Sequence, residues 1–300
     1  MLLRHIRYLL AVAEHQSFTR AAEELHVSQP TLSQQIRQLE ESLHVQLFDR
    51  SGRSVRLTDA GEVYTSYARR ALQDLDAGQR AIHDVQDLSR GLLRLAMTPT
   101  FTTYFIGHWV ERFNARYPGI ALNIKEMTQD QIEVALAENQ LDLGIAFSEV
   151  RSPDIDSEPL FIETLSLIVG KSHRFIGQQI SLTAKMLEHE GLALLSKDFA
   201  TRSHIDSYFQ RQGITPRIAI EANSISTIVE IVRRGRLATL LPDVIAHEQA
   251  GLYSIAIQPP LPQRNAVLLW RSGAYRSAAS QAFANLITHR FNVHQESDNF

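Results

Sequence analysis

The chain has 300 residues, 44% of them hydrophobic, with a formal net charge of −3 and no cysteine. This length predicts two domains with sizeable cores, and the charge excludes a basic surface over the whole molecule. The absence of cysteine excludes disulfides and thiolate chemistry and is typical of a reducing cytoplasm, and no apolar run approaches the roughly twenty residues of a membrane span.

The first elements are three helices. Residues 2–15 predict an amphipathic helix, and residues 18–37, FTRAAEELHVSQPTLSQQIR, predict two short helices joined by a tight turn. Thr19 is the expected cap of the first short helix. Ser28 is the expected N-cap of the second, with Pro30 in its first turn, where a missing N–H costs nothing. The second helix has one apolar stripe, made of Leu32, Ile36, Leu39 and Leu43.

The opposite face of this second helix, expected from about Pro30 to Glu41, is polar but carries few charges. Its side chains are those of Gln29, Thr31, Ser33, Gln34, Arg37 and Gln38. Such groups both donate and accept hydrogen bonds, which base edges in a major groove require. An ordinary helical hairpin is the alternative, but its solvated face would usually carry Glu and Lys. The pattern therefore favours a helix-turn-helix whose second helix reads DNA.

The segment VQLFDRSGRSVRLT, residues 45–58, predicts a small β-hairpin that turns at Ser51 and Gly52. Apolar side chains of this segment are expected to face inward, and they are Leu47, Phe48, Val55 and Leu57. Three arginines are expected to face outward, and they are Arg50, Arg53 and Arg56. A hairpin with this pattern suits a wing that contacts phosphates or the minor groove, and a solvated edge strand is the alternative.

Residues 59–90 predict one long helix, because no proline interrupts them and Thr58 can cap the start. One apolar stripe consists of Ala68, Leu72, Leu75 and Ile82. An adjacent face consists of Ala71, Gly78, Ala81, Val85 and Leu88. One small domain cannot bury both faces, so we expect this helix to pair with the same helix of a second chain. The alternative is that it lies on its own carboxy-terminal domain.

From Gly91 onward, strands alternate with helices. The expected strands are residues 92–97, 120–127, 141–147, 164–170, 192–196, 217–222, 236–242 and 266–271. The expected helices are residues 103–117, 130–138, 203–212, 226–233 and 277–291. This alternation indicates α/β lobes built on parallel sheets. The chain is expected to cross to a second lobe near residues 162–167 and to return near residues 261–267. Two lobes of this kind bind small ligands in the cleft between them.

Small polar residues gather where several of these strands end and the next helix begins. The candidate ligand-binding residues are Thr98, Pro99, Thr100, Thr128, Gln129, Phe147, Ser148, Thr201 and Arg202. Helix starts attract anions, and Arg202 is the expected cation beside them. Each Thr or Ser taken alone could be a plain N-cap. Several of them facing one cleft favour a pocket for an anion.

Catalytic and metal-binding patterns are absent from the sequence. It has no G-x-S-x-G, Walker or G-x-G-x-x-G motif, and its histidines never fall at H-x-H or H-x-x-x-H spacing. We therefore expect neither an enzyme nor a metalloprotein. The only expected cofactor is a bound small molecule.

The segments FTRAAEELHVSQPTLSQQIRQLEESL and LFDRSGRSVRLTDAG, with the long helix after them, resemble the LysR-type transcriptional regulators in order and spacing. The remainder resembles the effector domain of that family, which is similar to type 2 periplasmic binding proteins. The resemblance implies a winged helix-turn-helix in residues 1–58, a linker and dimerisation helix in residues 59–90, and a co-inducer-binding domain in residues 91–300. It also implies an activator in the cytoplasm that binds operator DNA and RNA polymerase, as a homodimer through the linker helix or a homotetramer.

The resemblance also assigns residues to functions. Those implied to face DNA are Phe18, Thr19, Gln29, Pro30, Thr31, Ser33, Gln34, Arg37, Arg50 and Arg53. The co-inducer is implied to meet Thr98, Thr100, Thr128 and Thr201. The segments TPTFTTYFIG, LDLGIAF, FATR, EANSIS and LTDAGEVY are similar to those of family members that respond to cyanate, which implies a small linear anion. Residues 171–174, KSHR, depart from the His-Pro that is frequent in the family, and this affects the first loop of the second lobe.

Two alternative functions stay open at this point. The chain could be a LysR-type regulator that responds to another small anion. It could also be a two-lobed solute-binding protein with an unrelated helical front end. The second alternative needs export, and the apolar run from Tyr8 to Ala13 is too short for a signal peptide and ends at Glu14.

Overall fold

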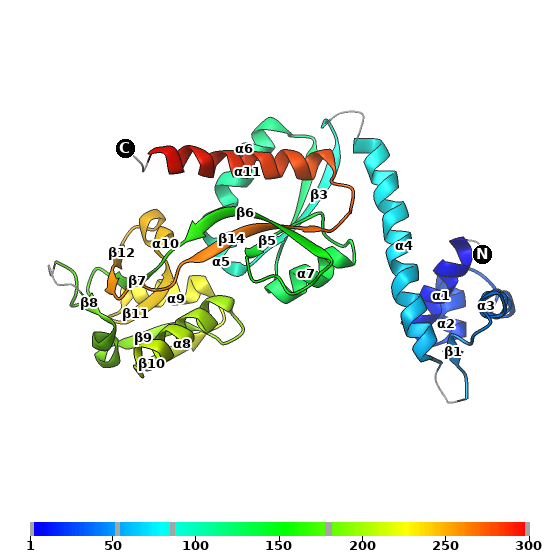
Figure 1. Cartoon of the computed structure of the whole chain (residues 1–300), viewed down its shortest axis with the longest axis horizontal. Helices are drawn as coiled ribbons and strands as arrows, with labels where there is room; N and C mark the ends of the chain where they lie inside the picture. The colour runs from blue at the N-terminus through cyan, green and yellow to red at the C-terminus, as the bar shows by residue number, and fades with distance from the viewer. Residues whose placement is uncertain (1–2, 52–54, 85–87, 178–181, 298–300) are drawn as a thin grey trace. The chain divides into compact units, whose positions relative to one another are not determined.

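The structure is a computed structural model that describes residues 3–51, 55–84, 88–177 and 182–297. The chain divides into two compact units, Met1–Ile82 and His83–Phe300, and each is described by itself (Figure 1). Among the described helices, none has the length and apolar content that a bilayer crossing requires.

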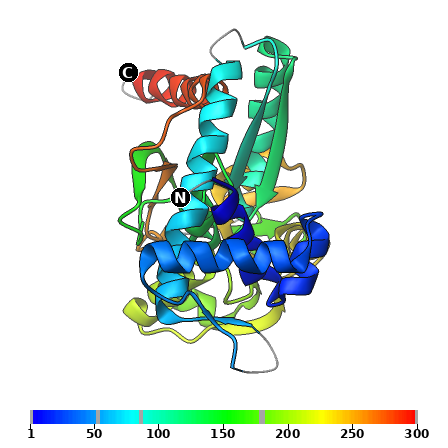
Figure 2. The ribbon, with the colours of Figure 1, turned by 90° about the vertical axis from the view of Figure 1, so that its right-hand side faces the viewer.

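The amino-terminal unit is a helical bundle with a short hairpin (Figure 2). Its elements are α1 (Leu3–His15), α2 (Phe18–Glu24), α3 (Gln29–Leu43), β1 (Phe48–Asp49), β2 (Arg56–Leu57) and α4 (Asp59–Asp84). The predicted stripe of α3 is buried at Leu32, Ile36 and Leu39, where it packs with α1. Strands β1 and β2 pair antiparallel, as the sequence predicts for a wing. Arg56 of β2 is exposed, and the tip of the hairpin lies outside the described residues.

The helix caps match the prediction at one position and differ at another. The Ser28 hydroxyl accepts a hydrogen bond from the backbone N–H of Thr31 at 3.3 Å, so the predicted cap of α3 is confirmed. The predicted Thr19 cap of α2 is wrong, because α2 begins at Phe18 and Ser17, two residues before Thr19, caps it. Ser17 has an extended backbone, which places its oxygen 3.4 Å from the N–H of Arg20.

Helix α4 begins as predicted, because the Thr58 hydroxyl accepts a hydrogen bond from the N–H of Gly61 at 3.0 Å. It is described as far as Asp84, and residues 88–90 form a turn instead of the predicted helical end. The predicted apolar stripe is buried at its start and exposed further along the helix. Ala68 and Leu72 pack on the core of their own unit. Leu75 and Ile82 are exposed, and so are Val63 and Tyr67.

The carboxy-terminal unit contains two lobes, each with a five-stranded sheet. The first sheet has the order β4-β3-β5-β14-β6, and its strands are β4 (Ile120–Glu126), β3 (Gly91–Met97), β5 (Leu143–Phe147), β14 (Arg264–Arg271) and β6 (Ile155–Glu163). The helices of this lobe are α5 (Pro99–Tyr104), α6 (Ile106–Arg116), α7 (Gln129–Ala137) and α11 (Ala278–Ser297). Helix α7 packs against β5 and β14, and α11 packs against α6.

The second lobe is built on the order β10-β9-β11-β7-β12. Its strands are β10 (Arg217–Ala222), β9 (Gly191–Leu195), β11 (Ala238–Pro242), β7 (Leu165–Gly170) and β12 (Leu252–Ile255), beside a small pair of β8 (Leu182–Thr183) and β13 (Ile257–Gln258). Its helices are η1 (Ala184–His189), α8 (Ala200–Gln212), α9 (Ile225–Arg234) and α10 (Asp243–Glu248). The predicted crossings between the lobes are confirmed, because the chain passes from β6 to β7 and returns through β14.

Both sheets are mixed, whereas the sequence pattern predicts parallel sheets. In the first lobe β14 runs antiparallel to β5 and β6, because the chain re-enters from the second lobe and runs back across the sheet. Strand β6 has no counterpart among the predicted strands. Its sequence, IDSEPLFIE, contains a proline and three acids, and Pro159 lies beside a register shift in the pairing with β14.

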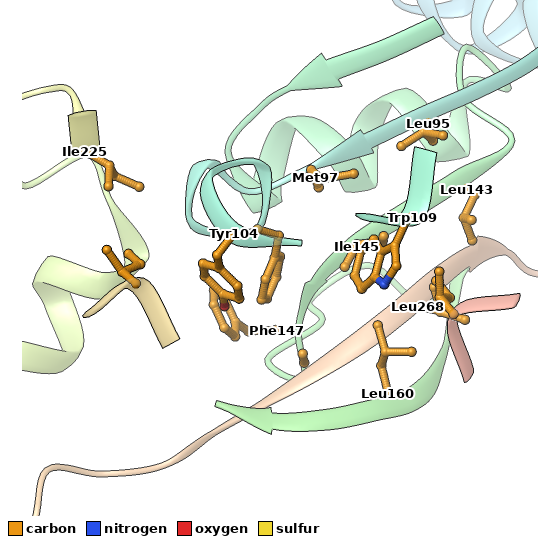
Figure 3. Close-up of a cluster of buried hydrophobic side chains, with 14 of the residues drawn as sticks. Leu95, Met97, Tyr104, Trp109, Leu143, Ile145, Phe147, Leu160, Ile225 and Leu268 are labelled. Atoms are coloured by element: carbon orange, nitrogen blue, oxygen red, sulfur yellow. The ribbon is translucent and has the colours of Figure 1, made fainter. Parts of the chain in front are cut away.

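The core of the first lobe is formed where α6 covers the sheet (Figure 3). Leu95, Ile145 and Leu268 come from three neighbouring strands and are at most 1% exposed. Trp109 of α6 lies over them and is 1% exposed. The core continues into the second lobe through residues such as Ile225.

Gly144 of β5 lies under α7, where a side chain does not fit. A Cβ at this position would lie 2.6 Å from Ile132 Cγ2 and 3.2 Å from Leu269 Cβ. We expect Gly144→Ala to destabilise the unit by roughly 1–3 kcal/mol in urea unfolding, since overpacking forces neighbours to shift. Gly107→Ala is the matched control in α6, where an added Cβ meets nothing within 4 Å. It should stabilise by about 1 kcal/mol or less, and equal effects of both changes would contradict this account.

Candidate functional site

The outer face of α3 is polar and exposed, as predicted. Gln29, Pro30, Thr31, Gln34 and Arg37 are exposed, and Ser33 is partly exposed. Two side chains on this face, those of Gln34 and Arg37, form no hydrogen bond or ion pair with any other residue that the structure describes. Both are therefore available to reach a base edge, while the buried stripe holds the helix from behind.

The wing is attached to α3 by the carboxylate of Glu40. Glu40 Oε1 accepts hydrogen bonds from the backbone N–H groups of Leu47 at 2.9 Å and Phe48 at 3.2 Å. Glu40 Oε2 accepts one from Arg50 Nη2 at 2.7 Å. The Arg50 guanidinium also lies 5.1 Å from the centroid of the Phe18 ring. Arg50 therefore fixes the wing against α3, in addition to any contact with DNA.

Two other residues expected at DNA, Phe18 and Thr19, lie at the start of α2. Thr19 is exposed in the first turn of α2. Phe18 is partly buried and packs edge-on against Phe48, with 5.9 Å between ring centroids. Arg53 lies outside the described residues.

A cavity of about 280 Å³ opens in the carboxy-terminal unit. Its walls come from both lobes and consist of Thr98, Pro99, Thr100, Thr128, Gln129, Asp130, Phe147, Glu149, Arg151, Lys197, Asp198, Phe199, Ala200, Thr201, Ser203 and His204. The volume suits a small ligand. Of the predicted ligand-binding residues, the structure brings all but Ser148 and Arg202 to this wall. Ser148 instead follows β5, and its backbone N–H donates to the carbonyl of Asn265 at 3.0 Å.

Two buried hydroxyls in the cavity wall have no partner. Thr98 and Thr100 are 4% and 2% exposed, and neither Oγ1 makes a hydrogen bond within the described residues. Buried polar groups in proteins nearly always have a partner, and leaving one unpaired costs about 1–3 kcal/mol. A ligand with hydrogen-bond acceptors would satisfy both groups.

The starts of two helices add partial positive charge to the cavity. Helix α7 begins at Gln129 after a capping box, in which the N–H of Thr128 donates to Gln131 Oε1 at 3.1 Å. Helix α8 begins at Ala200 and supplies Thr201, which is 2% exposed. Unpaired N–H groups in a first helical turn favour acceptors and anions.

The side chain of Arg202 turns away from the cavity. Its Nη1 donates to the carbonyl of Leu195 and to Glu221, each at 2.7 Å, and its Nε donates to Asp206 at 2.8 Å. These bonds attach α8 to β9 and β10. The cation expected from the sequence is therefore committed to the interior of the second lobe.

A different arginine, which the sequence analysis missed, lies behind the cavity wall. Arg264 begins β14 and is 3% exposed. Its guanidinium lies 3.8 Å from the centroid of the Phe147 ring, and its Nη1 donates to Thr201 Oγ1 at 3.1 Å. Its Nη2 forms an ion pair with Glu163, which is 101 residues away in the sequence. No local pattern could have joined residues so distant.

Glu163 and Tyr104 extend this buried group. The Tyr104 hydroxyl donates a hydrogen bond to Glu163 Oε1. Burial raises the pKa of Glu163, while Arg264 and the Tyr104 hydrogen bond oppose that change. Burial also raises the pKa of Tyr104 well above its usual value, so the phenol keeps its proton and acts as a donor. Tyr104 and Phe147 come from separate elements and lie near one another in Figure 3.

The rim of the cavity carries charges of both signs. Arg151 lies 3.3 Å from Asp130 across the mouth, and His204 Nε2 lies 3.7 Å from Glu149. Burial lowers the pKa of His204, and the nearby Arg264 charge lowers it further, so we expect a neutral imidazole at pH 7. Nowhere in the described residues do three or more His, Asp or Glu side chains gather as metal ligands.

Comparison with known proteins gives matches over nearly the whole chain. Residues 3–62 match the model of the bacterial regulatory helix-turn-helix proteins of the lysR family, and residues 86–292 match the LysR substrate binding domain. A RuBisCO operon transcriptional regulator of Allochromatium vinosum is 30% identical, over 95% of both chains. A hydrogen peroxide-inducible genes activator of Dickeya chrysanthemi is 27% identical, over 99% of this chain and 98% of that protein. A substituted full-length OxyR of Pseudomonas aeruginosa has a similar structure, with a TM-score of 0.71, 26% identity and coverage of 96% and 94%.

The attachment of the wing to α3 can be tested by hydrogen exchange on the full chain. We expect Glu40→Ala to speed exchange of the Leu47 and Phe48 amides by about 10- to 100-fold, because an unpaired buried donor costs roughly 1–3 kcal/mol. Glu41→Ala, on the exposed side of the same helical turn, should leave both amides protected. Unchanged exchange in Glu40→Ala would show that the carboxylate does not hold the wing.

Proposed function

The chain belongs to the LysR family of bacterial transcriptional regulators, and from this premise we propose that it is an operator-binding activator switched by a small anion. The anion binds in the cavity between the two lobes. The observation that carries the proposal is the pair of unpartnered hydroxyls of Thr98 and Thr100 in the wall of that cavity. They offer two donors in a buried space, beside the starts of α7 and α8.

The face of α3 is the proposed DNA-reading surface. Gln34 and Arg37 are the residues proposed to contact base edges, because both are exposed on α3. Gln29, Thr31 and Ser33 lie on the same helix nearer its start. The wing adds phosphate contacts. The net charge of −3 gives little general attraction to DNA, so two copies of the domain are needed to bind one operator tightly.

The exposed stripe of α4 is the proposed dimer contact. Val63, Tyr67, Leu75 and Ile82 are between 53% and 68% exposed in the single chain. Leu75 and Ile82 are seven residues apart, which places them on one face of a long helix, and Tyr67 and Val63 lie successively further round its surface. Pairing of two such helices covers this apolar surface and sets two recognition helices at a fixed spacing. The resulting pair of chains is a homodimer or one half of a homotetramer. The dimer acts in the cytoplasm on RNA polymerase at the promoter.

Cyanate is the proposed co-inducer, because a small linear anion can accept hydrogen bonds from the hydroxyls and helix starts that line the cavity. The regulators reported above are named for RuBisCO operons and for hydrogen peroxide. Peroxide acts on proteins mainly by oxidising thiolates, and this chain has no cysteine. Reversible binding of an anion is therefore the better-supported switch. A different small anion in the same cavity is the second candidate.

In the proposed mechanism the anion binds donors from both lobes and draws them together. Thr98 and Thr100 belong to the first lobe, and Thr201 belongs to the second. A ligand that contacts both lobes stabilises the closed arrangement. The free energy available for the switch is the difference between the ligand's binding free energies for the closed and the open arrangement. The closed lobes then change how the dimer spaces its recognition helices.

Base reading by α3 can be tested on a duplex that the protein selects from a random pool. We expect Gln34→Ala and Arg37→Ala each to weaken binding to the selected duplex by about 1–3 kcal/mol and to affect binding to random duplex less. Arg234→Ala, on an exposed arginine of α9, is the matched control and should change neither. Equal losses on both duplexes would mean that these residues contact only the backbone.

Anion binding can be tested by thermal unfolding with cyanate, azide, bicarbonate and short carboxylates. A ligand of the native state raises the melting temperature, and at 100 times its dissociation constant it adds about 2.7 kcal/mol of stability. We expect Thr100→Val to weaken the binding about tenfold or more, since one hydrogen bond is lost.

Thr239→Val is the matched control, because its hydroxyl is also buried and unpartnered but lies in β11, away from the cavity wall. This variant should show the same anion-induced rise in melting temperature as the wild-type protein. No shift with any of these anions would contradict the proposed co-inducer class.

A further inference from the structure

A buried ion pair lies where the chain passes between the lobes. Glu163 is the last residue of β6, from which the chain enters the second lobe, and Arg264 is the first residue of β14, through which it returns. Their side chains are 2% and 1% exposed. An ion pair removed this far from water carries no net charge, although each partner alone would have a strong field in a low-dielectric interior.

The pair is connected to the cavity through Thr201. Arg264 Nη1 donates to Thr201 Oγ1, which lines the cavity. A guanidinium has no acceptor, so this bond uses a lone pair of the hydroxyl and leaves its proton free to be donated. Arg264 thus fixes Thr201 as a donor toward the cavity. With Thr98 and Thr100, the wall offers hydroxyl donors from both lobes.

The remaining charges of the cavity do not favour a doubly charged ligand. The lining includes two cationic residues, Arg151 and Lys197, and three acids, Asp130, Glu149 and Asp198. Arg202 is bound to Glu221 and Asp206. Arg264 donates to the lining residue Thr201 from behind the wall, and Glu163 neutralises it. One negative charge on a ligand can be balanced by the hydroxyls and the helix starts, whereas a second meets a lining in which three acids outnumber two cations.

We propose that Glu163 determines the charge class of the ligand: by neutralising Arg264 it makes the cavity select monoanions with exposed acceptor atoms and reject dianions. This inference rests on the proposed function, because it concerns the ligand of the same cavity. Glu163 is a positioning residue, since it acts through Arg264 and Thr201 and does not itself line the cavity. Sequence patterns do not reveal it.

The test is the ratio of affinities for monoanions and dianions, measured by calorimetry on the full chain. Cyanate and acetate serve as monoanions, and malonate and sulfate serve as dianions. The wild-type protein should prefer the monoanions. Glu163→Gln keeps a side chain of the same shape but leaves the Arg264 charge uncompensated, so the ratio should move toward the dianions by about tenfold or more. A merely structural role would lower all affinities and leave the ratio unchanged, which would overturn the inference.

A second variant covers the case in which Glu163→Gln does not fold. The double change Glu163→Gln with Arg264→Gln replaces a buried ion pair by neutral groups, which proteins often tolerate. It removes both charges together, so its ratio should equal that of the wild type within about twofold, as net charge at the site is unchanged. A double variant that prefers dianions would contradict the proposal.

Thr201→Val distinguishes the contribution of the Thr201 hydroxyl to ligand binding from the contribution of the Arg264 charge. It should weaken all four anions by a similar factor, about tenfold, and leave the ratio unchanged. Thr239→Val is again the matched control and should change neither quantity. If the wild-type protein binds none of the four anions, the proposed function fails as well. If it binds them and Glu163→Gln does not move the ratio, only the present inference fails.

Discussion

The requirement that a buried polar group have a partner organises both candidate sites of this protein. In the amino-terminal unit the requirement is met, because Glu40 accepts the N–H groups of Leu47 and Phe48 and thereby holds the wing. In the carboxy-terminal unit it is left unmet at Thr98 and Thr100. Desolvated donors without acceptors are costly in a folded chain, and a cavity wall is where a ligand can remove that cost. The difference between the two units is the physical basis for assigning one to a rigid reading surface and the other to a switch.

The two functions lie in separate units of the chain, and coupling between them is a matter of free energy. A small-molecule effector can shift a regulator only by the difference between its affinities for two arrangements of that regulator. By linkage, operator binding must change the affinity for the effector by the same factor. Small differences suffice, since 1.4 kcal/mol is about a tenfold change in an equilibrium constant. The exposed apolar residues of α4, among them Tyr67 and Leu75, form the surface that we propose a second copy to cover.

Sequence patterns predicted most of the fold because they report local order. The cap at Ser28 and the stripe through Leu32, Ile36 and Leu39 depend on neighbours in one helix, and the structure has both. Strand β6 was missed because it is an edge strand, where proline and acids replace the apolar run typical of an inner strand. The sheets were taken as parallel because a local pattern carries no strand direction. The candidate cavity was predicted for the same local reason, since its threonines precede helices.

The charges around the cavity could not be predicted in this way. Arg202 stands at the start of a helix, where local reasoning places a cation for the ligand, yet Glu221 from another strand binds it. Arg264 and Glu163 meet only because two distant crossings between the lobes lie side by side. Contacts between residues far apart in the sequence therefore decide which arginine affects the cavity. Local patterns in a single sequence do not reveal those contacts.

The most direct test of the account is a nuclease footprint of the full-length protein on a selected operator duplex, taken with and without cyanate. If an anion between the lobes repositions two recognition helices, the protected region should shorten or shift as cyanate is added, and Thr100→Val should need about tenfold more cyanate for the same change. A footprint that stays identical at cyanate concentrations that saturate the cavity would contradict the account, because binding and DNA recognition would then be uncoupled.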